Sequence, residues 1–125
     1  MCSERIQSLI AQFREAVLEN AQYSSRALTD PKRKTDPDKA NRAHDRAHQC
    51  YKELRTTPEG RQAICDLMRD PDPYVRSAAA ARALFWKPEE ARQVLEELIE
   101  QGGILGFECE LVLKEFDAGR LSFDY

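Results

Sequence analysis

The chain has no apolar run long enough to cross a membrane, no glycine-rich phosphate loop and no Cys-x-x-Cys pair. A membrane-spanning helix needs about 20 consecutive, mostly apolar residues. A secretory signal needs a basic start followed by an apolar stretch, and the opening residues Met-Cys-Ser-Glu-Arg do not begin one. We therefore expect a cytoplasmic protein with no membrane partner.

The four cysteines are widely spaced along the chain. The spacing fits neither a disulfide framework nor a zinc site, because both use cysteines in recognisable, recurring spacings. Three of the four lie at helical positions next to apolar neighbours, which is typical of packed thiols. We expect reduced cysteines without a structural metal at these positions: Cys2, Cys50, Cys65 and Cys109.

Residues arranged for catalysis are also missing from the sequence. No Ser/His/Asp or Cys/His set has a recognisable context, and no carboxylate lies in an apolar stretch that would raise its pKa. His44 and His48 have the spacing of a zinc-protease helix, but Asp45 replaces the longer glutamate base and no third ligand follows at a recognisable distance. We therefore expect no enzyme activity, no cofactor and no metal.

Helical periodicity, in contrast, runs through almost the whole chain. Apolar residues recur at three- and four-residue spacing, and no alternating strand pattern persists. We expect one all-α domain over residues 1–125, with a charged loop at 30–38 and an apolar tail at 120–125 that covers the last helix. The first predicted helix runs from a Ser3 cap to about Leu28, and the second starts at Asp36-Pro37 and carries an apolar stripe as far as Leu54. Thr57-Pro58 opens a short third helix that buries Ile64, Leu67 and Met68, and the fourth starts at Asp72-Pro73 and ends near Phe85 or Trp86. The fifth starts at Lys87-Pro88 and is ended by a left-handed terminator at Gly102-Gly103, and the sixth carries an apolar stripe that includes Leu105 and ends near Gly119.

The most distinctive stretch is the alanine-rich segment 70–84. Asp72 is a good helix cap, and Pro73 suits the first helical position, where a missing N–H costs nothing. The alanines that follow keep nearly every face of this helix small and apolar, so neighbours can approach on more than one side. The segment therefore predicts the middle of a stack of helices.

The same segment resembles the second helix of a HEAT repeat, in which Asp-Pro, then Val-Arg, then a pair of alanines recur. The resemblance assigns the turn to Asp72-Pro73, core and inter-repeat contacts to Val75-Arg76, and close packing to Ala79-Ala80. Segments 91–98 and 106–119 are similar to a small bacterial family of HEAT-like helical proteins that has no reaction attached to it. Together with the short connections, this favours antiparallel helical hairpins stacked as a short HEAT-like α-superhelix.

Negative charge is concentrated in the last third of the chain. Residues 87–125 carry four basic and ten acidic side chains, a net charge of -6, against -3 for the whole chain. On the two last predicted helices, five of these acids are expected to face away from the apolar stripe: Glu89, Glu96, Glu100, Glu110 and Asp117. Such a surface would attract a basic partner, although outward acids also serve simply to keep a helix solvated.

Aromatic residues near these acids are candidate anchors for a protein partner. Tyr74 and Trp86 flank the alanine-rich helix, and Phe107 falls on the outward side of the last one. Each could equally be a packing residue. Together with the five acids, these three aromatic residues form the candidate partner-binding set.

A basic segment offers nucleic acid as the alternative partner. Residues 29–56 hold eight basic and five acidic side chains, a net charge of +3, and phosphate contacts need clustered lysine and arginine. The interleaved acids and a whole-chain pI near 5.5 weaken this field. The residues that would carry such binding are Lys32, Arg33, Lys34, Arg42 and Arg46.

These observations predict a protein-binding module. The chain resembles immunity proteins in its small size, its acidic face and its lack of catalytic residues. We therefore hypothesise that the chain is a bacterial immunity-type protein. It would neutralise a basic toxin of the nuclease class through an acidic helical surface. This last step is an analogy, because a fold does not specify a function. The oligomeric state stays open.

Overall fold

In the computed structural model, which describes residues 3–24 and 35–125, the chain is all-α. Six α-helices and one 3-10 turn occupy these two ranges, and no strand occurs in them. Contacts group the chain into two compact units, Met1–Ile64 and Cys65–Tyr125. The all-α prediction is confirmed, whereas the single domain and the HEAT-like stacking of hairpins stay predictions.

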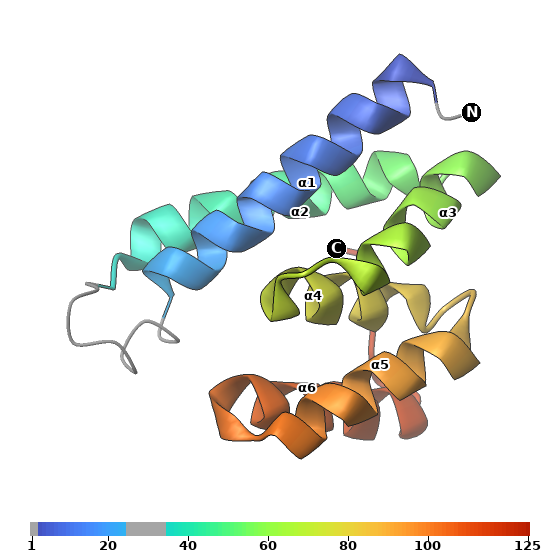
Figure 1. The fold of residues 1–125 in the computed structure, drawn as a ribbon. Coiled ribbons are helices and arrows are strands. Elements are labelled where there is room, and N and C mark those ends of the chain that lie inside the picture. Colours follow the sequence, from blue (N-terminus) through green and yellow to red (C-terminus); the bar gives the residue numbers. More distant parts are fainter. Residues whose placement is uncertain (1–2, 25–34) are drawn as a thin grey trace. The chain divides into compact units, whose positions relative to one another are not determined.

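The first unit is built on two antiparallel helices, α1 (Glu4–Tyr23) and α2 (Pro37–Leu54), which lie side by side in Figure 1. Both caps form as predicted: the Ser3 hydroxyl accepts from the Ile6 N–H at 3.1 Å, and Asp36 accepts from the Lys39 N–H at 3.1 Å. The buried positions follow the helical spacing of the sequence: Ile6, Leu9, Phe13, Ala16, Val17 and Ala21 on α1, and Ala40, Ala43, Ala47, His48, Cys50, Tyr51 and Leu54 on α2.

Helix α1 ends at Tyr23, so its predicted end at Leu28 is wrong. Ser24 is already extended, with φ -83° and ψ 178°. The Tyr23 carbonyl accepts a hydrogen bond of 2.8 Å from the Asp36 N–H, at the start of α2. This bond joins the two ends of the connection and satisfies a carbonyl that the helix end leaves free. Most of the predicted charged loop, residues 30–34, lies outside the described residues.

Helix α3 (Pro58–Asp66) starts close to the end of α2. A Cβ at Gly60 would lie 1.9 Å from the Leu54 carbonyl oxygen, so glycine alone fits at this crossing. The helix gives way to a 3-10 turn, Leu67–Arg69, rather than continuing as α-helix to Met68. Met68 is buried as predicted, while Leu67 is half-buried.

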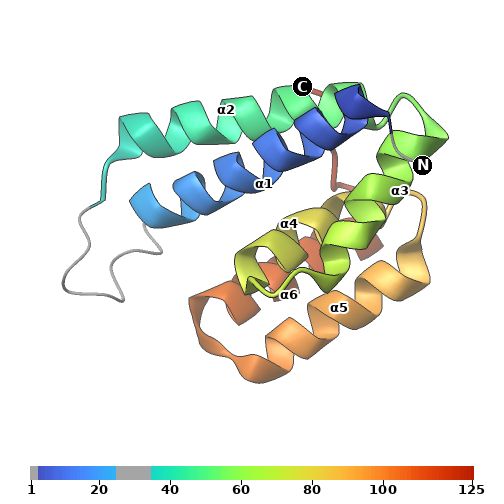
Figure 2. The same cartoon turned by 45° about the horizontal axis from the view of Figure 1, so that its top comes forward.

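The second unit contains α4 (Pro73–Ala83), α5 (Pro88–Gln101) and α6 (Gly103–Asp117). Helix α4 packs against both α5 and α6, and Figure 2 shows α5 and α6 joined by a tight turn. The alanines make this double contact possible, because side chains of one carbon let two neighbours approach. The buried residues of α4 are Val75, Ala79, Ala80, Ala81, Arg82 and Ala83.

Two helix ends in this unit differ slightly from the prediction, and the end of α5, at Gly102, lies where it was predicted. Helix α4 stops at Ala83, and the next three residues form turns. Helix α6 stops at Asp117 rather than at Gly119. Gly102 has the positive φ that its terminator role requires, but its ψ of -162° is extended rather than left-handed helical, a conformation open essentially to glycine.

The tail at 120–125 packs back on the second unit. The Phe123 ring meets the ring of Phe85, a residue just after α4, edge-on with 6.1 Å between the ring centroids. Phe85 in turn meets Phe116 of α6, with 5.9 Å between the centroids. The Arg120 guanidinium donates two hydrogen bonds of 3.0 Å to the Glu115 carboxylate. The tail therefore covers the end of α4 as well as contacting α6. Within the described ranges, no helix combines the length and apolar character that a bilayer-spanning segment requires.

The cap at the start of α4 gives a direct test of this fold. One Asp72 oxygen accepts from the N–H groups of Tyr74 at 2.8 Å and Val75 at 3.3 Å. Replacing Asp72 by alanine should lower the free energy of unfolding by about 1 kcal/mol, measured by urea denaturation. Asp72→Asn keeps an acceptor oxygen and should stay close to the wild type. Equal losses in both variants would contradict the capping role.

Candidate functional site

The outer face of α5 is a row of glutamates. The opposite side packs inward through Ala91, Leu95 and Leu98, each at most 2% exposed, so residues on the far side of the helical wheel face solvent. The predicted acids Glu89, Glu96 and Glu100 are all exposed. Glu97, which was not among the predicted acids, is also exposed. We call these four residues the α5 acidic face.

An ion pair links α5 to α6. The Arg92 guanidinium of α5 donates two hydrogen bonds to the Asp117 carboxylate of α6, one of them 3.3 Å long. The hydrogen bond to Asp117 raises the pKa of Arg92 above its ordinary value. Asp117 is thus an acid of the contact between the helices, and its charge is largely matched.

The prediction that Asp117 and Glu110 face directly away from the core is therefore wrong. Around α6 they lie only about 20° and 40° from buried Gly106, which places them on the flank of the helix rather than opposite its buried side. Both are nevertheless exposed. Glu110 also has a basic neighbour on its own helix, because the Lys114 ammonium lies 3.5 Å from its carboxylate.

Gly106 sets how α5 and α6 meet. A Cβ at this position would lie 2.9 Å from the Leu98 carbonyl oxygen, so the two backbones come closer than any other residue allows. With Gly106 beside Leu98 and Asp117 beside Arg92, the antiparallel register brings Glu110 to the level of Glu96. Glu110 and Asp117 thereby lie on the flank of α6 that meets α5.

Large apolar side chains are exposed along α6. Ile104 is 42% exposed, Phe107 60% and Leu111 44%. At spacings of three and four residues, they fall within about 60° of one another around the helix. The predicted anchor Phe107 thus has two apolar neighbours that the sequence analysis missed. We call these three residues the α6 stripe.

The other two predicted anchors occupy different places. Tyr74 and Trp86 are both half-buried; Tyr74 lies in the first turn of α4, whereas Trp86 lies in the turn that follows its last residue, Ala83, so the length of the helix separates them. The Trp86 indole donates to the Cys65 thiol at 3.2 Å. Its ring therefore packs within the second unit, and the two residues cannot form one anchor point.

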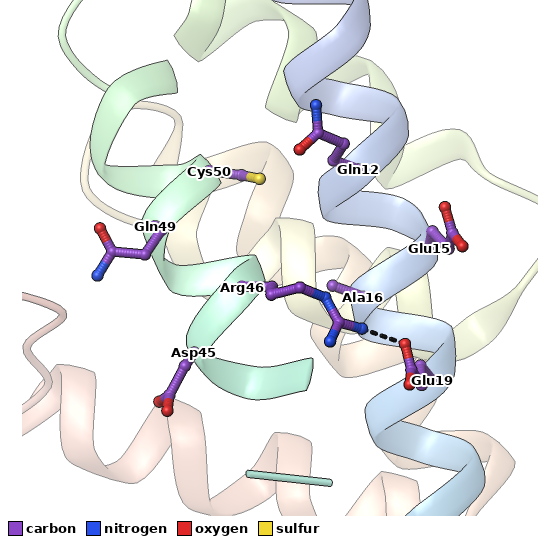
Figure 3. A pocket seen from close by; sticks show the side chains of 8 residues that line it. All are labelled: Gln12, Glu15, Ala16, Glu19, Asp45, Arg46, Gln49 and Cys50. Atoms are coloured by element: carbon purple, nitrogen blue, oxygen red, sulfur yellow. Dashed lines mark hydrogen bonds and ion pairs between the residues drawn. The ribbon is translucent and has the colours of Figure 1, made fainter. Parts of the chain in front are cut away.

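A groove of about 530 Å³ lies between α1 and α2 in the first unit. Figure 3 shows the Arg46 side chain reaching from α2 to Glu19 on α1, with the Cys50 sulfur directed toward α1. Burial raises the pKa of Cys50, so its thiol is a poor nucleophile at neutral pH. The lining contains no paired nucleophile and base: Gln12, Glu15, Ala16, Glu19, Asp45, Arg46, Gln49 and Cys50.

The basic segment of the alternative hypothesis is described only in part. Lys32, Arg33 and Lys34 lie outside the described residues. Arg42 is exposed, whereas Arg46 is paired with Glu19. A phosphate-binding role for this segment stays a prediction.

The two histidines pack into the first unit. The His44 and His48 rings stack at 6.4 Å, almost parallel, and His48 is only 4% exposed. The His48 ring also lies 6.2 Å from the Tyr51 ring. Over the residues that the structure describes, no group of three or more His, Cys, Asp or Glu side chains is placed to hold a metal ion.

A second cleft of the first unit, about 510 Å³, lies beside a two-point ion pair. The Arg5 guanidinium donates to the two oxygens of Glu53 at 2.6 and 2.7 Å. The hydrogen bond from Arg5 holds the pKa of Glu53 below its usual value of 4.5. Both side chains are well exposed, so this pair joins α1 to α2 without creating a reactive group.

Comparison with known proteins identifies a shared fold and no family. No family model matches the chain, and no curated protein matches it. Among solved structures, the crystal structure of the protein RPA1889 from Rhodopseudomonas palustris CGA009 is similar, with a TM-score of 0.76 and 22% identity over 98% of each chain. The chain therefore shares a helical fold with a bacterial protein. Membership of a HEAT-like family stays a prediction.

The Arg5–Glu53 pair predicts a pH dependence. Because folding lowers the pKa of Glu53, the pair stabilises the native state above pH 4.5 and loses this effect as the pH falls through the folded value. In Arg5→Gln, NMR titration of the Glu53 carboxyl should give a pKa close to the usual one. An unchanged pKa in this variant would contradict the assigned cause.

The α5 acidic face predicts an asymmetry between its two ends. Glu89 lies in the first turn of α5, where the helix dipole favours an acid, and Glu100 lies near its end, where no basic residue offsets it. Glu100 also repels Glu96 one turn away. Glu100→Gln should therefore raise the free energy of unfolding by about 0.3–1 kcal/mol at low salt. Glu89→Gln, the matched control, should not stabilise the protein, and equal stabilisation by both would contradict this electrostatic account.

Proposed function

We propose that this chain is a protein-binding module whose binding surface is formed by the outer sides of α5 and α6. The observation that carries the proposal is the α6 stripe, with Phe107 60% exposed at its centre, beside a concentration of acids. Single exposed apolar residues are common on proteins, but a contiguous apolar row rimmed by charged side chains marks an interaction site.

The arrangement of charge supports a basic partner. On α5, Glu96 and Glu100 are one turn apart, and no basic residue occupies the last turn. Such a row destabilises the free helix through repulsion and through the helix dipole. Lysine or arginine side chains of a partner would relieve this repulsion on binding, and the field would also speed the encounter.

Within this proposal, the partner class that fits best is a basic toxin domain. A nuclease that binds phosphates needs a surface of lysine and arginine, and an acidic surface of this kind would cover it. The chain would then act as an immunity-type protein, neutralising the toxin by occupying its basic site rather than by catalysis. This assignment rests on charge and on size, and its test is a binding experiment.

The proposal predicts that binding depends on where the charge lies. The test partner is any basic protein that a neighbouring gene is found to encode. Glu96→Lys combined with Glu100→Lys should weaken binding to such a protein at least tenfold, measured by calorimetry. Raising the salt concentration should weaken wild-type binding.

The matched control places the same two charge reversals on the first unit, as Glu15→Lys with Asp45→Lys, both exposed positions. Both double variants change the net charge of the chain by the same amount, so the control accounts for that change. It should bind the partner within about threefold of the wild-type affinity. Equal losses in the two double variants, or no binding by the wild type, would contradict the proposal.

A further inference from the structure

We propose that the α6 stripe seats a cationic amphipathic helix of the partner protein. This inference rests on the proposed function and deepens it, because it specifies the structural element that the partner presents. Ile104, Phe107 and Leu111 are the apolar part of the contact. The acids around them select positive charge on the partner.

The spacing of the stripe favours a helix as the occupant. Its three residues stand at i, i+3 and i+7 and extend over about 10 Å, or two turns of α6. A helix laid along this row matches it, because its own apolar residues recur at the same spacing and pack between those of α6. Recognition through apolar residues at this spacing is a recurrent way in which a helix binds another protein.

Charge complementarity identifies the flanks of that helix as basic. Helix α6 carries four acids, of which Glu110, Glu115 and Asp117 pair with Lys114, Arg120 and Arg92. With these basic residues counted, residues 87–125 still have a net charge of -6. On α5, Glu89, Glu96 and Glu100 lie within about 80° of Arg92, which pairs with α6, so they add three acids on this side. Residues flanking the apolar row of the partner would therefore be lysine or arginine.

The same charges disfavour a second copy of this chain on the stripe. Two α6 helices packed through their stripes would bring two acidic helices and their neighbouring α5 acidic faces together. Like charges placed opposite each other across an interface are destabilising. The occupant is therefore a basic helix rather than another copy.

The test uses the full chain and two synthetic 14-residue peptides of leucine and lysine. One peptide has leucine at i, i+3, i+4 and i+7 spacing, so that it forms one apolar face, and the other has the same composition in scrambled order. Fluorescence anisotropy should give at least tenfold tighter binding of the amphipathic peptide. Because both peptides carry the same charge, this difference isolates the apolar face.

Two substitutions tie the binding to the stripe. Phe107→Ala should weaken binding of the amphipathic peptide at least tenfold, while Phe107→Leu, which keeps an apolar side chain, should retain it within about threefold. Tyr125→Ala is the matched control, since Tyr125 is 59% exposed but lies in the tail, and it should leave the affinity unchanged. Circular dichroism checks that each variant is folded.

The outcomes separate this inference from the proposed function. Equal binding of both peptides, weakened in Glu96→Lys with Glu100→Lys but not in Phe107→Ala, would overturn the helix inference and leave a purely electrostatic binding surface. Failure of both peptides to bind would also overturn it, while the experiment with the basic protein decides the proposed function independently. Self-association that Phe107→Ala abolishes would make a second copy the occupant and overturn the inference as well.

Discussion

The close approach of two backbones at Gly106 is the constraint on which the candidate surface depends. Only glycine fits there, because any Cβ would lie 2.9 Å from the Leu98 carbonyl oxygen. The contact fixes the antiparallel register of α5 and α6, and this register brings Asp117 to Arg92. It also fixes the rotation of α6, since the side that carries Gly106 packs inward and the side that carries Phe107 is left exposed.

Local chemistry explains why the helix starts could be predicted from the sequence. Ser3, Asp36 and Asp72 each cap a helix with a side-chain oxygen, and a cap needs only its own few neighbours. The alanine-rich stretch after Asp72 likewise identified a helix with contacts on several sides. That stretch contributes the scaffold of the second unit, and the candidate binding residues lie on the helices that pack against it.

Features that depend on packing between helices could not be predicted in this way. The periodic pattern continues past Tyr23, so the end of α1 follows from the extended backbone of Ser24 and from the hydrogen bond between Asp36 and the Tyr23 carbonyl. Helix α6 is apolar on most of its sides, and no helical wheel tells which side meets a neighbour. The side of α6 that packs inward decides that Ile104 and Leu111 are exposed. It also decides that Asp117 lies at the contact with α5.

The central claim is that the chain binds a basic protein through the outer sides of α5 and α6. Amide chemical-shift mapping of the full chain, titrated with a basic protein that a neighbouring gene is found to encode, tests this claim most directly. The account predicts that the largest shifts fall within residues 93–115 and include Phe107 and Leu111. Largest shifts in the groove between α1 and α2, around Arg46 and Cys50, would contradict it.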